Sequence, residues 1–373
     1  MNILITGGFG FIGKSLIDAL IDNNHITVID SLLPQVHGNS PQIIEHRNLI
    51  FIKYHLGSGD LSSVLPPEKF NFDVIIHLAS ETGTGQSMYL ISPYVLSNVM
   101  GTAELFDYLV KYNLKIQKFI LSSSRSVYGE GAYLSSVSNT LIHPNPRLKK
   151  DLDKNIWDFI TFNEDEYLQP IPTHESLDCS PISVYAETKL SQENLVRIMA
   201  NVCNYDFIIL RLQNVYGEGQ SLLNPYTGIM SIFYNQLRQD LPIQIYEDGL
   251  QIRDFVHISD VKSSFVCSLD SSAISGIYNI GSGLPISILD IATRLSSLSG
   301  YDPNFIFEGK FRLGDIRACY ADISSASDSL NWKPQVSVDE GLLHLIEWAN
   351  TQPIYKSMLS NSEQELSRYG ISK

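Results

Sequence analysis

Tyr185 and Lys189 are four positions apart in the run Tyr185-Ala186-Glu187-Thr188-Lys189. On a helix, residues with this spacing lie on one face, so a phenol and an ammonium would project together. Such a pair can remove and return a proton, because a nearby positive charge favours the anionic form of tyrosine. The spacing alone is weak evidence, since a chain with 19 tyrosines is expected to show it about once by chance.

A run of serines strengthens the interpretation. Ser122-Ser123-Ser124 ends an apolar strand-like segment and is followed by Arg125-Ser126. In a parallel sheet, ligands bind at the carboxyl ends of the strands, where this run would lie. We expect Ser124 to hydrogen-bond a reacting oxygen and to stabilise charge that develops on it.

Gly7, Gly10 and Gly13 stand between the first expected strand and the first helical segment. At that place, glycines allow a tight turn, close approach of a pyrophosphate and close packing of the helix, whose N-terminus faces the negative charge. Asp30 ends the second expected strand, where a carboxylate accepts hydrogen bonds from the adenosine ribose and repels a 2′-phosphate. The sequence therefore predicts a site for NAD rather than NADP.

Composition excludes several other classes. Of the 373 residues, 44% are hydrophobic, which suits a compact core, and 40 acidic against 26 basic residues give a net charge of −14. We expect no nucleic-acid or membrane partner, because the overall field opposes polyanions. An anionic small ligand would need locally placed arginines.

The four cysteines, Cys179, Cys203, Cys267 and Cys319, form no C-x-x-C pair, so neither a metal site nor a disulfide framework is expected. The N-terminus has no basic leader, and no apolar run approaches the length of about 18 residues that a membrane span needs. We expect a cytoplasmic protein.

Strand-like runs alternate with helical spacing in the first half, which indicates an α/β fold with a Rossmann-type doubly wound parallel sheet. The six strands expected there are residues 2–6, 26–30, 49–53, 74–78, 119–122 and 207–212. We place the NAD-binding domain at residues 1–213, with an insertion at about 130–178.

Residues 214–373 are expected to form a smaller α+β substrate-binding lobe, with about 254–270 packing back on the first domain. Isolated strands at 243–246 and 277–280 and a helix at 287–298 are predicted in it. The last 20 or so residues are expected to be weakly ordered.

Further motifs give the chain a specific resemblance: His77-Leu78-Ala79, Asn98-Val99-Met100-Gly101-Thr102, Arg211-Leu212-Gln213-Asn214-Val215-Tyr216-Gly217, Arg253-Asp254-Phe255-Val256-His257 and Gly314-Asp315. With them, the chain resembles the extended short-chain dehydrogenases/reductases, in the NAD-dependent nucleotide-sugar epimerase/dehydratase family. The run from Glu81 to Met88, with Gly219-Gln220-Ser221 and Asn224-Pro225-Tyr226-Thr227-Gly228, most resembles the dTDP-L-rhamnose 4-epimerase group.

The resemblance implies a role for each site residue. Tyr185 would be the base, Lys189 would supply positive charge and hold the ribose, and Ser124 would bond the sugar oxygen. Residues expected to bind the cofactor are Gly7, Phe9, Gly10, Phe11, Ile12, Gly13, Asp30, Leu56, Leu78, Ala79, Ser80, Asn98, Ser122, Tyr185 and Lys189. Residues expected to bind the substrate are Thr84, Ser124, Arg125, Asn214, Arg253, Arg312 and Asp315, the arginines Arg253 and Arg312 clamping its diphosphate.

Two departures from the family pattern stand out. Tyr54-His55-Leu56 replaces the usual Gly-Asp-Ile/Val after the third strand, which leaves the adenine contact open. Arg125 and Ser126 stand where a 4,6-dehydratase carries an acid pair and where a decarboxylase carries an acidic residue. The sequence therefore disfavours both of these activities.

The expected activity is that of an isomerase of carbohydrate biosynthesis: NAD-dependent epimerisation of a nucleotide-diphosphate sugar, at C4 of a dTDP- or UDP-hexose or a dTDP-6-deoxyhexose, through a 4-keto intermediate. The alternatives are an NAD(P)H-dependent 4-ketoreductase, a 4,6-dehydratase, and a regulatory protein that only binds NAD. The resemblance also implies a homodimer.

Overall fold

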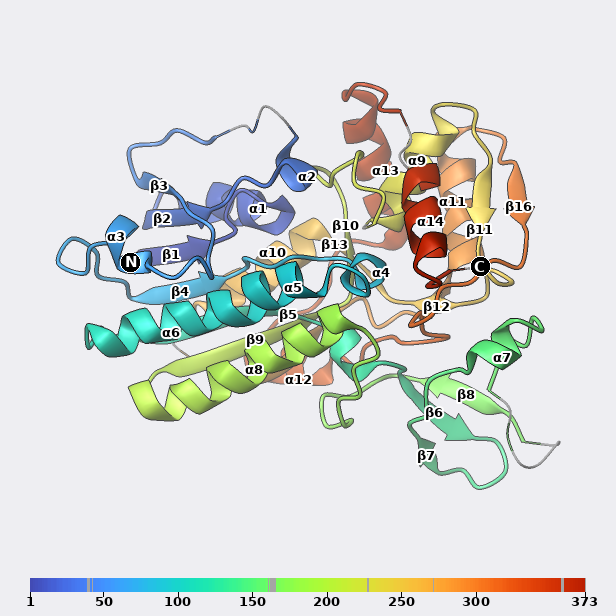
Figure 1. Ribbon diagram of the computed structural model, residues 1–373, viewed down its shortest axis with the longest axis horizontal. Helices are drawn as coiled ribbons and strands as arrows, with labels where there is room; N and C mark the ends of the chain where they lie inside the picture. Colours follow the sequence, from blue (N-terminus) through green and yellow to red (C-terminus); the bar gives the residue numbers. More distant parts are fainter. Residues whose placement is uncertain are drawn as a thin grey trace.

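The central sheet has seven parallel strands in the order β14-β9-β5-β4-β1-β2-β3 (Figure 1). The structure is a computed structural model that describes residues 1–38, 41, 43–159, 161, 166–226, 228–270, 272–356 and 359–372. The strands are β1 (Asn2–Thr6), β2 (His25–Asp30), β3 (Leu49–Lys53), β4 (Val74–His77), β5 (Lys118–Ser124), β9 (Asp206–Leu212) and β14 (Gly276–Ile280). Most are buried on both faces, as apolar, β-branched strands of a parallel sheet require.

Helices cover both faces of the sheet and create two apolar cores. On one face lie α1 (Phe11–Leu20), α10 (Ile258–Ser268) and α12 (Ser324–Leu330), which contribute Leu16, Phe265 and Ala326. On the other lie α6 (Gly101–Lys111) and α8 (Val184–Cys203), which contribute Leu105 and Val196. Because the strand order reverses between β1 and β4, a ligand crevice is expected at their carboxyl ends. The predicted fold class is confirmed.

The prediction for residues 277–280 was wrong. This segment is not an isolated strand of the smaller lobe: β14 pairs in parallel with β9 and forms the edge of the central sheet. The chain therefore returns to the first domain after crossing to the second. The pairing partner of this strand cannot be predicted from its own residues, because a short apolar run can pair with any of several strands far away along the chain. The domain boundary at residue 213 stays a prediction.

The smaller lobe is built on α9 (Ile229–Leu237), α11 (Ile288–Ser299) and α13 (Val338–Asn350), which share one core. Ser287 caps α11 by accepting a hydrogen bond from the backbone N of Asp290 at 3.0 Å, as the sequence indicated. Three two-stranded ladders complete the lobe: β10 (Asn214–Tyr216) with β13 (Phe255–His257), β11 (Ile243–Ile245) with β16 (Phe305–Phe307), and β12 (Ile252–Arg253) with β15 (Ile286–Ser287).

The described part of the insertion is a small three-stranded antiparallel sheet with one short helix, at the lower right of Figure 1. Its elements are β6 (Ala132–Ser135), β7 (Leu141–Ile142), β8 (Leu168–Ile171) and α7 (Lys149–Leu152). Residues 160 and 162–165 of the predicted insertion lie outside the described residues.

The C-terminal segment, which we expected to be weakly ordered, contains a helix in its described part; residues 357, 358 and 373 lie outside the described residues. Residues Leu359–Arg368 form helix α14, and the ring of Tyr369 stacks on Tyr89 with centroids 4.8 Å apart. The shorter helices are α2 (Pro34–His37), α3 (Leu61–Val64), α4 (Thr84–Ser87), α5 (Ile91–Tyr94), the π-helix η1 (Val95–Met100) and the 3-10 helix η2 (Arg125–Tyr128). Within the described ranges, no helix has the length and apolar character of a membrane span.

Candidate active site

A cavity of about 540 Å³ lies at the carboxyl edge of the central sheet and is lined by residues of both halves of the chain. Most of the residues that the sequence singled out line it: Gly7, Gly10, Phe11, Ile12, Gly13, Asp30, Leu56, Leu78, Ala79, Ser80, Thr84, Ser122, Ser124, Arg125, Tyr185, Lys189, Asn214, Arg253, Arg312 and Asp315. Phe9 and Asn98 do not. Phe9 is buried in the apolar core against Phe51, and Asn98 lies behind the cavity wall.

The glycine-rich turn has the shape that a pyrophosphate needs. Gly7 adopts φ +68°, and a Cβ there would come within 2.8 Å of the backbone N of Ala79. A Cβ on Gly13 would collide with the carbonyl oxygen of Gly8, so only glycine lets α1 start this close to the turn. A Cβ on Gly10 would meet only the carbonyl oxygen of Gly7, at 3.2 Å. The open N-terminus of α1 thus faces the cavity with unpaired N–H groups.

Asp30 lies at the end of β2 on the cavity wall and is held in one orientation. Its Oδ2 accepts a hydrogen bond from the backbone N of Phe9 at 3.0 Å, and its Oδ1 accepts one from Leu32 at 2.8 Å. Burial alone would raise its pKa, but the contact with His37 and these hydrogen bonds outweigh it and lower the pKa below the usual value. The group is a fixed anion, which suits contact with ribose hydroxyls and disfavours a 2′-phosphate.

The loop after β3 is held by a residue from a distant part of the chain. Tyr54, His55 and Leu56 all line the cavity. A carboxylate reaches this loop from α6: Glu104 accepts hydrogen bonds from the hydroxyl of Tyr54 and the backbone N of Gly57, both at 2.5 Å. This contact could not be predicted from local sequence pattern, because Glu104 lies 50 residues from Tyr54 along the chain.

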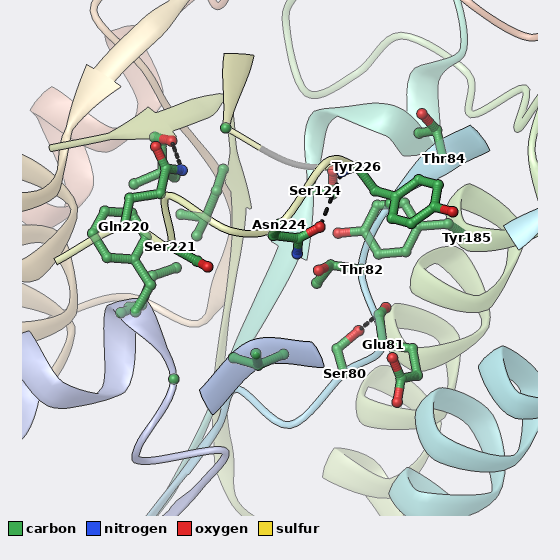
Figure 2. Close-up of a pocket in the computed structure, with 18 of the residues that line it drawn as sticks. Ser80, Glu81, Thr82, Thr84, Ser124, Tyr185, Gln220, Ser221, Asn224 and Tyr226 are labelled. Carbon is green, nitrogen blue, oxygen red and sulfur yellow. Dashed lines mark hydrogen bonds between the residues drawn. The ribbon is translucent and has the colours of Figure 1, made fainter. Parts of the chain in front are cut away.

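The three predicted catalytic residues meet at one place in the cavity. Ser124 is the last residue of β5, and Tyr185 and Lys189 occupy the first turns of α8, which Ser183 caps by accepting a hydrogen bond from Ala186. The side chains of Tyr185 and Ser124 line the same part of the cavity, and Lys189 donates from Nζ to the carbonyl oxygen of Ser122 at 2.8 Å. Figure 2 shows Ser124 and Tyr185 together with Asn224 and Tyr226 from the second half of the chain.

Burial dominates the proton affinities of this group. It raises the pKa of Tyr185 above its usual value, despite the opposing effects of the Ser124 hydrogen bond and the positive charge of Arg125. Burial lowers the pKa of Lys189 to about 7, although the negative charge of Glu193 opposes the shift. The ammonium of Lys189 is held at the Ser122 carbonyl, and its effect on the phenol of Tyr185 stays a prediction.

The substrate end of the cavity carries two arginines with different surroundings. Arg253 is buried and donates to the carbonyl oxygens of Ile252 and Ile316, each at 2.8 Å. Burial, reinforced by the positive charge of Arg125, lowers its pKa to about 10. The guanidinium of Arg312 lies 4.5 Å from the ring centroid of Tyr246. Neither forms a salt bridge with a carboxylate among the described residues, so both are available to an anionic ligand.

Unpaired polar atoms mark where a ligand would bind. Within the described ranges, the cavity-lining side chains with a buried N or O atom that lacks a hydrogen-bond partner are Gln213, Asn214, Gln244, Gln251 and Arg312. Leaving such an atom unpaired costs about 1–3 kcal/mol, so this end of the cavity is built for a polar ligand. In Gln213 both amide atoms are unpaired, and it directly follows Leu212, which pairs with Ser124 across the sheet.

Sequence reasoning missed several further lining residues, including Glu81, Thr82, Gln220, Ser221, Asn224 and Tyr226 (Figure 2). Their runs carried the resemblance, but no single chemical group distinguished them. The C-terminal helix also closes this end, since Glu365 accepts hydrogen bonds from the hydroxyls of Tyr89 at 2.7 Å and Tyr226 at 2.5 Å. Thr227, within the quoted run, lies outside the described residues.

One group of side chains away from this cavity has metal-ligand chemistry: the ligand atoms of Glu218, His257 and His344 lie within 4.8 Å of one another. Oε2 of Glu218 and Nε2 of His257 already lie 3.0 Å apart. None of the three lines the cavity.

Comparison with known proteins agrees with this site. The family model described as the NAD-dependent epimerase/dehydratase family matches residues 3–147 and 164–281. A dTDP-L-rhamnose 4-epimerase of Burkholderia thailandensis is 38% identical over 353 residues, covering 93% of this chain and 94% of that protein. A dTDP-4-dehydro-6-deoxyglucose reductase of Escherichia coli is 28% identical, covering 93% of this chain and 96% of that protein.

Among solved structures, the UDP-glucuronic acid 4-epimerase of Bacillus cereus, in complex with UDP-glucuronic acid and NAD, superposes with a TM-score of 0.73. It is 30% identical, and the match covers 94% of this chain and 99% of that one. These findings confirm the predicted family, an enzyme fold of the Rossmann type and the dependence on NAD. The chain belongs to the NAD-dependent epimerase/dehydratase family.

Proposed function

We propose that this protein epimerises a nucleotide-diphosphate sugar at C4, with a dTDP-6-deoxyhexose as the first substrate to test and UDP-hexoses as the second. The observation that carries the proposal is the placement of Ser124, Tyr185 and Lys189 in the same cavity as Arg253 and Arg312. The first group of side chains can move a proton at a sugar hydroxyl, and the two arginines can hold a diphosphate.

Each residue has a definite part in the reaction. Tyr185 takes the proton from the C4 hydroxyl, and Ser124, which lines the same part of the cavity, stabilises the oxygen as the 4-keto sugar forms. NAD⁺ held at the glycine-rich turn would accept hydride from C4 and return it to the other face, and its positive ring would favour the anion of Tyr185. Arg253 and Arg312 anchor the diphosphate while the keto sugar turns between them and Tyr185.

The alternatives differ in what they require beside Ser124. A 4,6-dehydratase or a decarboxylase needs acidic groups directly after it, and the structure places Arg125 and Ser126 there. Glu81 also lines the cavity, but it lies on the loop after β4 and not directly after Ser124. Burial raises the pKa of its carboxyl group, and the effect of His55 opposes this shift. A 4-ketoreductase needs only the same three residues, and the reductase from Escherichia coli keeps it as the second candidate. A protein that merely binds NAD would not need Tyr185 beside Ser124.

A substrate with deuterium at C4 separates these reactions. Epimerisation returns the label to C4 of the inverted sugar without added cofactor, dehydration moves it to C6, and a reductase leaves the saturated sugar unchanged unless stoichiometric NAD is supplied. Mass spectrometry and NMR of the product from dTDP-L-rhamnose, with UDP-glucose as comparison, give the answer. Deuterium at C6 of the product contradicts the proposal. The absence of a C4-inverted product from every dTDP- or UDP-sugar tested contradicts it as well.

The proposal includes a homodimer in the cytoplasm. Side chains exposed by two fifths or more lie on adjacent helices of one face: Ile91, Val95, Leu96 and Met100 on α5 and η1, and Ile198 and Val202 on α8. A second copy of the chain would cover them. Sedimentation of the purified protein tests this, and a monomer at micromolar concentration contradicts it.

A further inference from the structure

We propose that the described part of the insertion supports the substrate site from outside the cavity, and that Arg147 is a positioning residue that fixes Arg253 and Tyr246 for binding the substrate diphosphate. The inference rests on the proposed function, because it needs a nucleotide diphosphate in the cavity. Arg147 itself does not line the cavity, so it acts through the segments that it holds.

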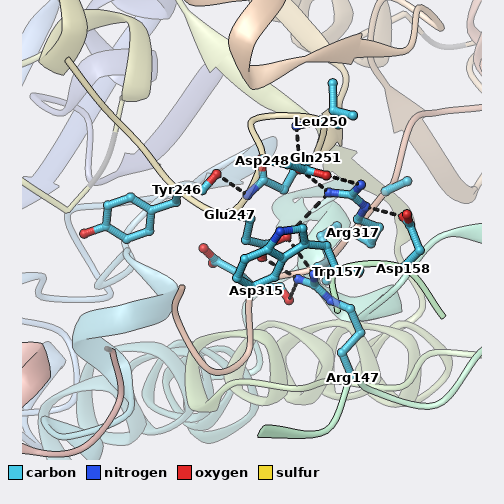
Figure 3. A network of polar contacts seen from close by, with 12 residues as sticks. Arg147, Trp157, Asp158, Tyr246, Glu247, Asp248, Leu250, Gln251, Asp315 and Arg317 are labelled. Carbon is cyan, nitrogen blue, oxygen red and sulfur yellow. Dashed lines mark hydrogen bonds and ion pairs between the residues drawn. The ribbon is translucent and has the colours of Figure 1, made fainter. Parts of the chain in front are cut away.

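Arg147 makes a buried bidentate salt bridge with Glu247 of the smaller lobe (Figure 3). Its Nη1 lies 2.7 Å from Oε2 and its Nη2 lies 2.9 Å from Oε1, and the side chains are 4% and 1% exposed. The same two nitrogens donate to the carbonyl oxygen of Trp157 at 3.1 Å and of Asp315 at 2.9 Å. Such a bidentate, charge-assisted pair fixes both distance and orientation. Arg147 thus joins the insertion to two segments of the substrate lobe.

The first of these segments carries Tyr246. Glu247 has φ +53°, a left-handed conformation that is unfavourable for a residue other than glycine. The contact with Arg147 and the hydrogen bond from its own backbone N to the carbonyl of Lys310, at 2.7 Å, hold it there. This turn sets the direction of the preceding Tyr246, whose ring lies against the guanidinium of Arg312.

The second segment, residues 315–318, aims Arg253. Arg253 donates from Nη2 to the carbonyl oxygen of Ile316 at 2.8 Å and from Nη1 to that of Arg317 at 3.4 Å. The insertion holds this segment at several points. Asp315 is bound by Arg147, and Glu130 accepts hydrogen bonds from the backbone N of Arg317 at 2.9 Å and of Ala318 at 3.3 Å.

The side chain of Arg317 completes the link. Its fork donates to Asp248 at 2.7 and 2.8 Å, and its Nε donates to Asp158 of the insertion at 2.7 Å (Figure 3). The acidic groups of this network are thereby paired with Arg147 and Arg317, whereas Arg253 is left with carbonyl partners. Its charge is free for an anion, and its position depends on carbonyls that the insertion holds.

Four variants test the inference. Arg147→Met removes the bidentate pair, and Arg147→Lys keeps the charge without it. Arg147→Met with Glu247→Gln also removes the buried carboxylate, which would otherwise keep only Arg317 Nη1, at 3.6 Å, as a charged partner. Lys150→Ala, at an exposed position of α7, three residues further along the chain, is the control. For each NAD-loaded protein, the affinity for dTDP and for UDP is measured by calorimetry, together with KM, kcat, NAD content and unfolding temperature.

We expect Arg147→Met to weaken nucleotide binding and raise KM by about tenfold or more, a change of about 1.4 kcal/mol, with kcat within about threefold of wild type and NAD content unchanged. The double variant should regain thermal stability, because no buried charge is left unpaired, but not affinity. Arg147→Lys should lie between, and Lys150→Ala should match wild type.

Two results would overturn the inference in different ways. Wild-type affinity and KM in the folded double variant mean that Arg147 serves stability alone; this outcome leaves the proposed function intact. A wild-type protein that binds neither dTDP nor UDP overturns the proposed function and the inference with it. If Arg147→Met does not fold, the Lys variant and the double variant decide the matter.

Discussion

Asn98 donates a hydrogen bond from Nδ2 to Oγ1 of Thr188 at 2.9 Å, which ties the π-helix η1 to the turn of α8 between Tyr185 and Lys189. The same amide holds the loop after β4, since Oδ1 accepts from the backbone N of Glu81 at 2.7 Å and Nδ2 donates to its carbonyl at 3.1 Å. One buried amide therefore fixes the catalytic helix relative to a wall of the cavity. A π-helical turn at this point is typical of a functional site.

Replacing Asn98 by alanine should misplace this wall without removing any group that touches substrate. The backbone N–H and C=O of Glu81 would lose their partner, at a cost of about 1–3 kcal/mol in the free energy of unfolding. We expect kcat to fall by about tenfold or more, because small displacements of catalytic groups are costly. Steady-state kinetics and urea unfolding check both effects. Unchanged kcat in a destabilised variant would reduce Asn98 to a purely structural role.

Tyr185→Phe tests the base. Loss of the phenolic oxygen should lower kcat by about two to four orders of magnitude while NAD remains bound, because that oxygen handles the proton. Tyr108→Phe is a matched control: its hydroxyl is buried on α6, away from the cavity, and has no hydrogen-bond partner among the described residues. Rates with a dTDP-sugar and NAD content of the purified proteins are the measurements. Full activity in Tyr185→Phe would remove Tyr185 from the mechanism.

Asp30→Ala tests the choice of cofactor. The fixed carboxylate should favour NAD through the ribose hydroxyls and repel the phosphate of NADP, so the ratio of the two affinities is the informative quantity. We expect this ratio to fall by about tenfold or more, as for hydrogen bonds to a charged group. Fluorescence titration with both cofactors gives the ratio, with Asp22→Ala, at an exposed carboxylate, as control. An unchanged ratio would show that selection lies elsewhere.

The sequence predicted the parts of this molecule that depend on local pattern. The glycine turn, Asp30, Ser124 and the pair Tyr185 and Lys189 have fixed spacings or fixed places at strand ends, and all of them line one cavity. What it did not predict depends on distant partners. Glu104 bonds the loop after the third strand, β14 joins the sheet from the second half, and Glu365 of the C-terminal helix reaches Tyr89 and Tyr226.

Arg253→Met should separate ligand binding from stability. The buried guanidinium of Arg253 has lost contact with water, and its carbonyl partners do not fully replace that hydration. Its lowered pKa of about 10 reflects this cost of burial. Removing it should change the free energy of unfolding of the NAD-loaded protein by no more than about 1 kcal/mol, but weaken dTDP or UDP binding by about tenfold or more. Arg294→Met, at a surface arginine paired with Asp290 and Asp339, should leave binding unchanged. Equal nucleotide affinity in the two variants would contradict the assignment.

The pH dependence of stability should report on His77, which lies at the end of β4 beneath the cavity. Burial, with a smaller effect of the positive charge of Lys189, lowers its pKa to about 3. The neutral ring contacts Thr6 Oγ1 at 2.7 Å through Nδ1 and Thr102 Oγ1 at 2.8 Å through Nε2. Between the unfolded pKa of about 6.5 and the folded value, the unfolded chain therefore binds one more proton than the native protein.

The stability that neutral His77 contributes is complete above about pH 6.5 and is lost as the pH falls toward 3, by up to about 1.4 kcal/mol per pH unit. His77→Gln should be less stable than wild type at neutral pH, because it loses a hydrogen bond, but it lacks this titration. The gap between the two proteins should therefore narrow as the pH falls, while His46→Gln, at a half-exposed histidine, follows wild type. Urea unfolding of the NAD-loaded proteins between about pH 6.5 and 4.5 measures the gap. Parallel curves for wild type and His77→Gln would mean that His77 is not held neutral, and that Thr6 and Thr102 face a charged ring.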